Sequence, residues 1–217
     1  MTPDKFATFR EAGLVRIPVT RRLLADLETP LSCFCKLGNR PWTYLLESVS
    51  GGEKWGRYSC IGLDAKERIE VRNKEIKRYV NDNLVELIQS TDPFLWINKY
   101  RKKLGVIPSS VMKQLDLPIF IGGLVGFFGY ETIGFHEPKI IFDETSNDDI
   151  DAPDILLMRS EDVVVFDNLS GILILITHAN PQDPENLSRA ELRLDAIVEK
   201  LKTPIKKFDE IKKTFSV

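Results

Sequence analysis

The sequence predicts an α+β protein with a mostly antiparallel sheet or sandwich and three or four flanking helices. Short apolar runs of strand length follow one another through tight turns, without the regular strand–helix alternation of a parallel sheet. Only a few segments carry apolar residues at helical spacing. The 217 residues, 43% of them hydrophobic and 29% charged, can bury a sizeable core.

Helix and strand signals alternate at the start of the chain. Residues 3–12 predict a helix, because a proline stands at its start and two phenylalanines lie three positions apart. Residues 14–20 alternate as a half-buried strand. Residues 21–28 predict one or two helical turns. The Thr-Pro step that follows predicts an N-cap for a short helix over residues 31–37.

Hairpins dominate the middle of the chain. Residues 68–71 and 75–80 alternate as strands around an Asn-Lys turn. Residues 84–88 fit either a third strand or a helical turn. A Thr-Asp-Pro start predicts a helix from residue 93 to about Leu104, and a short helical piece follows at residues 109–115.

The last third predicts strands followed by a long helix. Residues 118–135 contain a glycine-rich segment that predicts a buried strand, whose glycines allow neighbouring groups to approach closely. Residues 154–166 and 171–178 predict two apolar strands joined by an Asp-Asn-Leu-Ser turn. Residues 185–201 predict an amphipathic helix.

Familiar catalytic and phosphate-binding motifs do not fit this chain. The segment GGLVGFFG over residues 122–129 differs from the dinucleotide fingerprint G-x-G-x-x-G, and no lysine follows it as in a phosphate-binding loop. The two histidines, His136 and His178, show no spacing typical of a metal site or a nucleophile pair. The residues alone therefore predict no catalytic set.

Charge and cysteine content limit the classes of partner. Thirty basic and thirty-two acidic residues give a net charge of −2, which predicts neither nucleic-acid nor membrane binding. The N-terminus has no apolar segment typical of a secretion signal. Cys33, Cys35 and Cys60 fit no zinc or redox spacing. We expect a cytoplasmic protein with reduced, mostly buried thiols.

The stretch from Tyr44 to Gly62 is the strongest candidate for a binding role. Two apolar segments flank a polar loop with a Gly-Gly pair, the pattern of a hairpin. Glu47 and Ser48 close the first strand, and Arg57 and Tyr58 open the second. A carboxylate, a hydroxyl, a guanidinium and aromatic rings suit a zwitterionic small molecule. An ordinary hairpin with a surface salt bridge has the same pattern and is more common.

Three segments resemble anthranilate synthase component I, in its N-terminal region. They are LLES at residues 45–48 with GGEKWGRYSCIG at 51–62, GGLVGFFGYE at 122–131, and DAPD at 151–154 followed by apolar strands. The resemblance extends from about Phe6 to the tail. The first segment is specific, whereas related chorismate-using enzymes share the glycine segment.

The resemblance implies a lyase of tryptophan biosynthesis. The family converts chorismate to anthranilate and pyruvate, using Mg²⁺ and ammonia delivered by a glutamine amidotransferase subunit (component II). L-Tryptophan inhibits it. By this resemblance Ser48 contacts the inhibitor, and Leu46 and Glu47 belong to the same pocket. Arg57 and Tyr58 complete the expected tryptophan-binding set.

The resemblance also implies a domain division. We expect residues 1–203 to form the N-terminal regulatory domain, and residues 204–217 to start a linker to a C-terminal chorismate-binding domain. The Mg²⁺ ligands and catalytic residues of the family lie in that domain, so this chain alone should be inactive and need no cofactor. The alternatives are a free-standing amino-acid-sensing domain and the corresponding domain of aminodeoxychorismate synthase component I.

Overall fold

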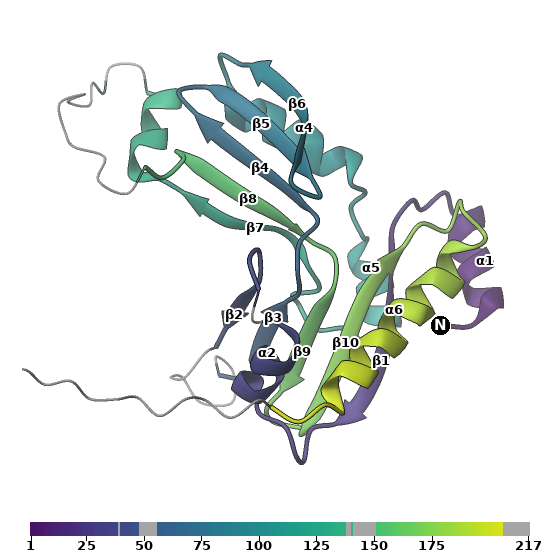
Figure 1. The fold of residues 1–217 in the computed structure, drawn as a ribbon. Helices are drawn as coiled ribbons and strands as arrows, with labels where there is room; N and C mark the ends of the chain where they lie inside the picture. The colour runs from purple at the N-terminus through teal and green to yellow at the C-terminus, as the bar shows by residue number, and fades with distance from the viewer. Residues whose placement is uncertain (39, 48–55, 138–139, 141–150, 206–217) are drawn as a thin grey trace, which may run out of the picture.

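Two five-stranded antiparallel sheets form the framework of the protein (Figure 1). The computed structural model describes residues 1–38, 40–47, 56–137, 140 and 151–205. The first sheet has the order β1 (Ile17–Leu24), β10 (Ile172–Ala179), β9 (Val163–Asp167), β3 (Tyr58–Gly62), β2 (Tyr44–Leu46). The second has the order β6 (Asn83–Gln89), β5 (Glu75–Val80), β4 (Glu67–Arg72), β8 (Ile155–Ser160), β7 (Gly123–Phe128). The predicted α+β class is confirmed.

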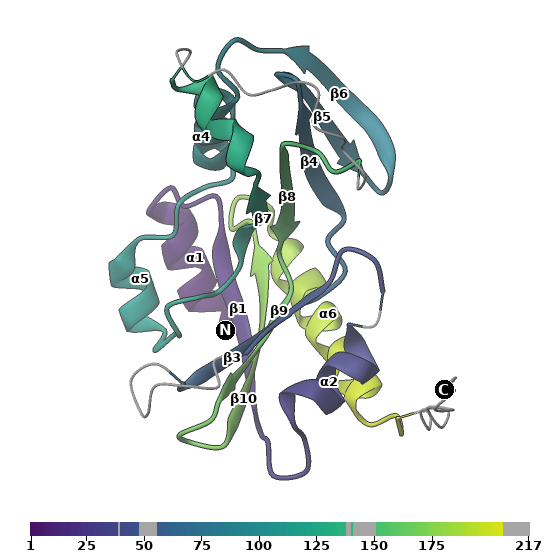
Figure 2. The ribbon, with the colours of Figure 1, turned by 90° about the vertical axis from the view of Figure 1, so that its left-hand side faces the viewer.

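Helices cover both faces of the first sheet and one face of the second. One face of the first sheet packs against α1 (Pro3–Glu11), α2 (Pro30–Leu37) and α6 (Asn186–Leu201), and its other face against α5 (Ser109–Gln114). The second sheet packs against α4 (Pro93–Lys103) and the 3₁₀ helix η1 (Tyr130–Phe135). Figure 2 shows α4 beside the second sheet and α6 beside the first. Within the described residues, no helix is long and apolar enough to cross a membrane.

Burial on both faces explains the continuous apolar strands of the first sheet. All five residues of β9 are buried. In β10, Leu173 and Leu175 join the core under α6, whereas Ile174 and Ile176 join the core under α5. A strand covered on both sides has no solvent-facing positions to fill with polar residues, so its sequence does not alternate.

Local signals place most element ends where the sequence predicts them. Thr29 forms a capping box with Ser32 at the start of α2, and the Asp92 side chain accepts a hydrogen bond from the Leu95 amide at the start of α4. Asn73 and Lys74 both have positive φ, as a tight hairpin turn requires. Residues 84–88, for which the sequence fits either a strand or a helical turn, belong to the strand β6.

A single two-stranded ribbon passes through both sheets. β3 pairs with β9 in the first sheet, and the segments that continue them, β4 and β8, pair in the second. Gly62 pairs with Val163 and Arg68 pairs with Met158, so the residues between these pairs, 63–67 on one segment and 159–162 on the other, differ in number by one. This one-residue offset marks the bend, as a bulge does.

Residues 21–28 do not form the predicted helical turns. β1 instead continues to Leu24, with Arg21 and Leu24 opposite Leu175 and Ile172 of β10. Long-range pairing with a buried strand outweighs a weak local preference for helix in so short a segment.

The predicted strand over residues 154–166 is two strands in different sheets. β8 ends at Ser160 and β9 begins at Val163, with the chain crossing between the sheets in the two intervening residues. Both parts are apolar, so hydrophobicity alone did not reveal the crossing.

The glycine-rich strand lies at an edge and is partly exposed, which corrects the prediction of a buried strand. β7 is the outer strand of the second sheet, and Phe127 is 42% exposed. The expected close approach does occur. A Cβ on Gly126 would lie 1.8 Å from the Leu156 carbonyl oxygen, so only glycine fits there.

Glu67 is the centre of a buried ion cluster where the ribbon enters the second sheet. Its carboxylate accepts hydrogen bonds from Arg78 (2.7 Å), Arg159 (2.8 Å) and the Tyr100 hydroxyl (2.5 Å). Burial opposes ionisation, but these donors outweigh it and lower the pKa of Glu67. The cluster joins β4, β5, β8 and α4 through one carboxylate.

Removing the charge of Glu67 should destabilise the fold far more than removing the charge of Glu86, a more exposed carboxylate that also binds Arg78. Glu67→Gln leaves two arginines without full compensation, so we expect a loss of about 3 kcal/mol in the free energy of unfolding. Glu86→Gln, whose carboxylate also binds Arg78 but is partly exposed, should cost less than about 1 kcal/mol. Urea unfolding measures both, and equal losses would contradict the role given to Glu67.

Candidate functional site

The β2–β3 pair forms the predicted hairpin at one edge of the first sheet. Tyr44, Leu45 and Leu46 pair with Gly62, Ile61 and Cys60. The Tyr44 ring covers Gly62 so closely that a Cβ there would lie 1.9 Å from the ring. The Tyr44 hydroxyl shares a 2.7 Å hydrogen bond with the Ser160 hydroxyl at the end of β8. The hairpin is thus attached to the bend of the ribbon.

The structure brings four of the five expected tryptophan-site residues to one end of this hairpin. Leu46 ends β2 and is 51% exposed, and Glu47 follows it, also exposed. Tyr58 begins β3, two positions before Cys60, which pairs with Leu46. Arg57 precedes it, and its guanidinium lies 4.9 Å from the centre of the Tyr58 ring. Ser48 lies outside the described residues.

Arg57 is held by a carboxylate that the sequence did not reveal. Its Nε and Nη2 donate to the two carboxylate oxygens of Asp167, at 2.9 and 2.6 Å. These hydrogen bonds lower the pKa of Asp167 to about 2 and raise the pKa of Arg57. The Asp167 side chain is only 8% exposed, so the pair fixes the start of β3 to the end of β9.

The turn that follows Asp167 also forms hydrogen bonds with the start of β3. Asn168 donates its backbone N–H to the Arg57 carbonyl (2.8 Å) and its side-chain amide to the Gly56 carbonyl (3.2 Å) and the Ser59 hydroxyl (3.3 Å). The sequence predicted this turn only as a strand connection. Residues 110 positions apart give no local signal of their contact, so only the sheet pairing identifies Asp167 as the partner of Arg57.

The cavity beside this ion pair is small. About 50 Å³ is enclosed by residues that include Arg57, Tyr58 and Asp167. That volume holds a few water molecules, but a pocket for a small organic ligand usually measures at least about 300 Å³. The described residues alone therefore provide a rim of suitable groups and no enclosed slot for an indole ring.

Cys33 and Cys60 are unsuited to act as nucleophiles, and the described residues contain no cluster of metal-ligating side chains. Cys33 and Cys60 are free and buried, and burial raises the pKa of Cys60 to about 11 and of Cys33 to about 12. Both are protonated at neutral pH and are weak nucleophiles. Across the described ranges no three His, Cys, Asp or Glu side chains gather as a metal site.

The chain is similar in sequence to several proteins named anthranilate synthase component 1. The chain is 47% identical over 188 residues to anthranilate synthase component 1 of Neisseria meningitidis serogroup C, covering 85% of this chain and 37% of that protein. The chain is homologous to a part of anthranilate synthase component 1. The protein of that name from Pseudomonas aeruginosa is 38% identical over 207 residues, and that from Aquifex aeolicus is 37% identical over 189.

The match covers only part of each anthranilate synthase component 1. The chain spans 37% of the Neisseria protein, 40% of the Pseudomonas protein and 36% of the Aquifex protein. The fold also resembles the crystal structure of anthranilate synthase component I from Streptococcus pneumoniae, with a TM-score of 0.53 at 22% identity, over 85% of this chain and 37% of that one. No protein-family model matches the chain.

The Arg57–Asp167 pair should make stability depend on pH in the acid range. The folded-state pKa of Asp167, about 2, lies below the unfolded value of about 4, so the pair stabilises above about pH 4 and the stabilisation is lost as pH falls through about 2. The difference in free energy of unfolding between wild type and Asp167→Asn should therefore grow from about pH 2 to 5 and then stay constant.

Urea unfolding at a series of pH values measures that difference. Asp116→Asn is the control, because Asp116 pairs with Arg22 through a side chain that is 88% exposed. A difference for Asp167→Asn that does not change with pH, or that matches the control, would contradict a structural role for the pair.

Proposed function

We propose that this chain is the N-terminal regulatory domain of anthranilate synthase component 1, with one side of its tryptophan feedback site on the β2–β3 hairpin. The observation that carries the proposal is similarity at 37–47% identity over 85–94% of this chain, confined to 36–40% of relatives of that name. On this proposal the complete protein is a cytoplasmic lyase that makes anthranilate and pyruvate from chorismate.

The groups at the end of the hairpin match the parts of tryptophan. The exposed side chain of Leu46 offers an apolar surface for the indole ring, and the exposed carboxylate of Glu47 offers a partner for the ammonium. Ser48 is proposed to contact the inhibitor directly. Arg57 is already bound to Asp167, so we assign it to holding the start of β3, with Tyr58 beside it. The remaining wall of the pocket is assigned to another part of the longer polypeptide.

Exposed apolar side chains at both edges of the second sheet support a larger assembly. The opposite edge strands β6 and β7 present large apolar side chains that are 42–55% exposed, namely Leu84, Val85 and Leu87 on β6 and Phe127 and Phe128 on β7. Contact of such side chains with water is unfavourable, so a partner that covers either edge would gain apolar burial. We assign one of these edges to the chorismate-binding domain of the same polypeptide. The glutamine amidotransferase subunit, component II, is the second proposed partner.

Feedback inhibition then follows from differential binding. Tryptophan can shift the enzyme toward an inactive arrangement only by binding that arrangement more tightly. A pocket made jointly by the hairpin and the second domain has this property, because its two walls separate when the domains move. Mg²⁺ binding and catalysis are assigned to that second domain, as the resemblance to the family implies.

Substitution of Ser48 tests the assignment in the longer polypeptide that carries this chain. Ser48→Phe should raise the tryptophan concentration for half-inhibition by at least about tenfold, because a bulky side chain excludes the inhibitor, while kcat and KM for chorismate stay near wild type. Ser50→Phe is the matched control in the same segment. Inhibition unchanged by Ser48→Phe would remove this residue from the site.

The activity of the 217-residue chain tests whether catalysis belongs to the proposed second domain. Incubated with chorismate, Mg²⁺ and ammonium, it should give no increase in anthranilate fluorescence, whereas the longer polypeptide should. Turnover by the 217-residue chain would place catalytic residues in it and contradict the proposal.

A further inference from the structure

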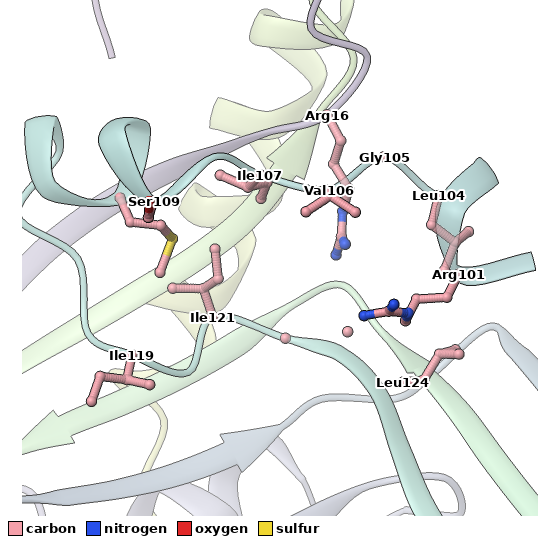
Figure 3. A pocket seen from close by; sticks show the side chains of 13 residues that line it. Arg16, Arg101, Leu104, Gly105, Val106, Ile107, Ser109, Ile119, Ile121 and Leu124 are labelled. Carbon is pink, nitrogen blue, oxygen red and sulfur yellow. The ribbon is translucent and has the colours of Figure 1, made fainter. Parts of the chain in front are cut away.

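A second cavity opens where the chain passes from α4 to α5 and from α5 into β7 (Figure 3). Its volume is about 330 Å³, which is within the range of small-molecule sites. Its wall is mostly apolar, with Leu104, Val106, Ile107, Met112, Ile121 and Leu124 among the lining residues. None of the described residues of the β2–β3 hairpin lines it.

Two arginine side chains point into this apolar space. Figure 3 shows the guanidinium groups of Arg16, from the segment before β1, and Arg101, from the last turn of α4, extending into the cavity. Arg101 donates one hydrogen bond to the side-chain oxygen of Asn98 at 3.1 Å. The Nε and Nη2 atoms of Arg16 are buried and have no hydrogen-bond partner among the described residues.

Buried guanidinium nitrogens without hydrogen-bond partners are costly. Burial lowers the pKa of Arg16, but an arginine stays charged in proteins, so the cost cannot be relieved by losing the proton. A buried charge is normally paired, and leaving one without a counter-charge opposes folding. Among the described residues, Glu161 acts on Arg16 only at a distance and no carboxylate binds its guanidinium directly, so a negative group in the cavity would be stabilised.

The nearby carboxylates are bound to other arginines. Glu161, whose charge acts on Arg16, accepts a 2.5 Å hydrogen bond from Arg159. Glu67 also binds Arg159. Neither carboxylate accepts a hydrogen bond from Arg16. The positive charge of Arg159 adds to the positive potential at Arg16.

His178 does not neutralise Arg16 either. Burial lowers the pKa of His178 to about 3, so the ring is neutral. Its Nδ1 lies 2.8 Å from the Glu161 carbonyl oxygen and must donate there, which leaves Nε2 as a buried acceptor without a partner. A neutral acceptor can receive a hydrogen bond, but it leaves the positive charge of Arg16 uncompensated.

Two glycines, Gly122 and Gly123, also line the cavity. Gly122 and Gly123 have φ of +108° and +131°, a conformation that side chains rarely adopt. A Cβ on Gly123 would meet no atom within 4 Å, so the cavity stays open at the start of β7. The backbone can thus be approached closely by a bound molecule.

We propose that this cavity binds a small monocarboxylate with an apolar body, the carboxylate on Arg16 and Arg101 and the body against the apolar wall. Planar guanidinium groups recognise carboxylates through paired hydrogen bonds. The apolar lining favours a ring or branched chain over a fully hydrated ion. The site is separate from the tryptophan rim, and its ligand need not be an amino acid because none of the described lining residues carries a carboxylate that could bind an ammonium group.

Benzoate is the probe, because it joins a carboxylate to a compact apolar ring. The melting temperature of the 217-residue chain should rise saturably with benzoate and should respond little to its neutral analogue benzamide or to inorganic phosphate. Amide NMR signals of Gly122 and Gly123 should shift with benzoate, and that of Gly171, at a distant turn, should not. Equal responses to benzamide or phosphate would overturn the proposed ligand class.

Arg16→Met separates a binding role from a structural one. Removal of an uncompensated buried charge should leave the ligand-free melting temperature equal or higher, while the affinity for benzoate falls by at least about tenfold. Arg101→Met should also weaken benzoate binding, and Arg10→Met, at an exposed position on α1, should not.

Three results would overturn the proposal. They are no saturable benzoate response of the wild-type chain up to about 10 mM, an Arg16→Met variant that binds benzoate as tightly as wild type, and benzoate-induced shifts confined to residues away from the cavity.

Discussion

The two-stranded ribbon formed by β3–β4 and β8–β9 is the feature on which the rest of the structure depends. It is the hydrogen-bonded link between the two sheets, and its bend is fixed by buried polar contacts. Glu67 holds Arg78, Arg159 and Tyr100 on the second-sheet side. On the first-sheet side, the Leu63 amide donates to the Asp162 carbonyl at 3.0 Å. The buried cores of the two sheets are separate, so these contacts are what hold the angle between the sheets.

The proposed regulatory hairpin is built on this ribbon. β3 is one strand of the hairpin and also one strand of the ribbon, and the Tyr44–Ser160 hydrogen bond ties the other hairpin strand to the bend. A ligand at the hairpin end would therefore act on a stiff element that reaches both sheets. Packed and hydrogen-bonded elements of this kind transmit a binding preference better than an isolated loop does.

Local patterns in the sequence were enough to predict most elements and the end of the hairpin that collects Leu46, Glu47, Arg57 and Tyr58. Caps such as Thr29 and Asp92, and turns such as Asn73–Lys74, act within a few residues and can be recognised directly. The errors came from long-range pairing. Residues 21–24 became strand because β10 lies beside them, and residues 161–162 became a crossing because neighbouring strands belong to different sheets. The Asp167 partner of Arg57 and the charged cavity around Arg16 arise from tertiary contacts without a local signal.

Calorimetric titration with L-tryptophan tests the central claim most directly. The account predicts that the longer polypeptide binds tryptophan saturably, and that the 217-residue chain, with its cavity of only about 50 Å³ beside Arg57, binds it weakly or not at all. Absence of binding to the longer polypeptide, or equally tight binding to the 217-residue chain, would contradict a tryptophan site shared between this hairpin and another domain.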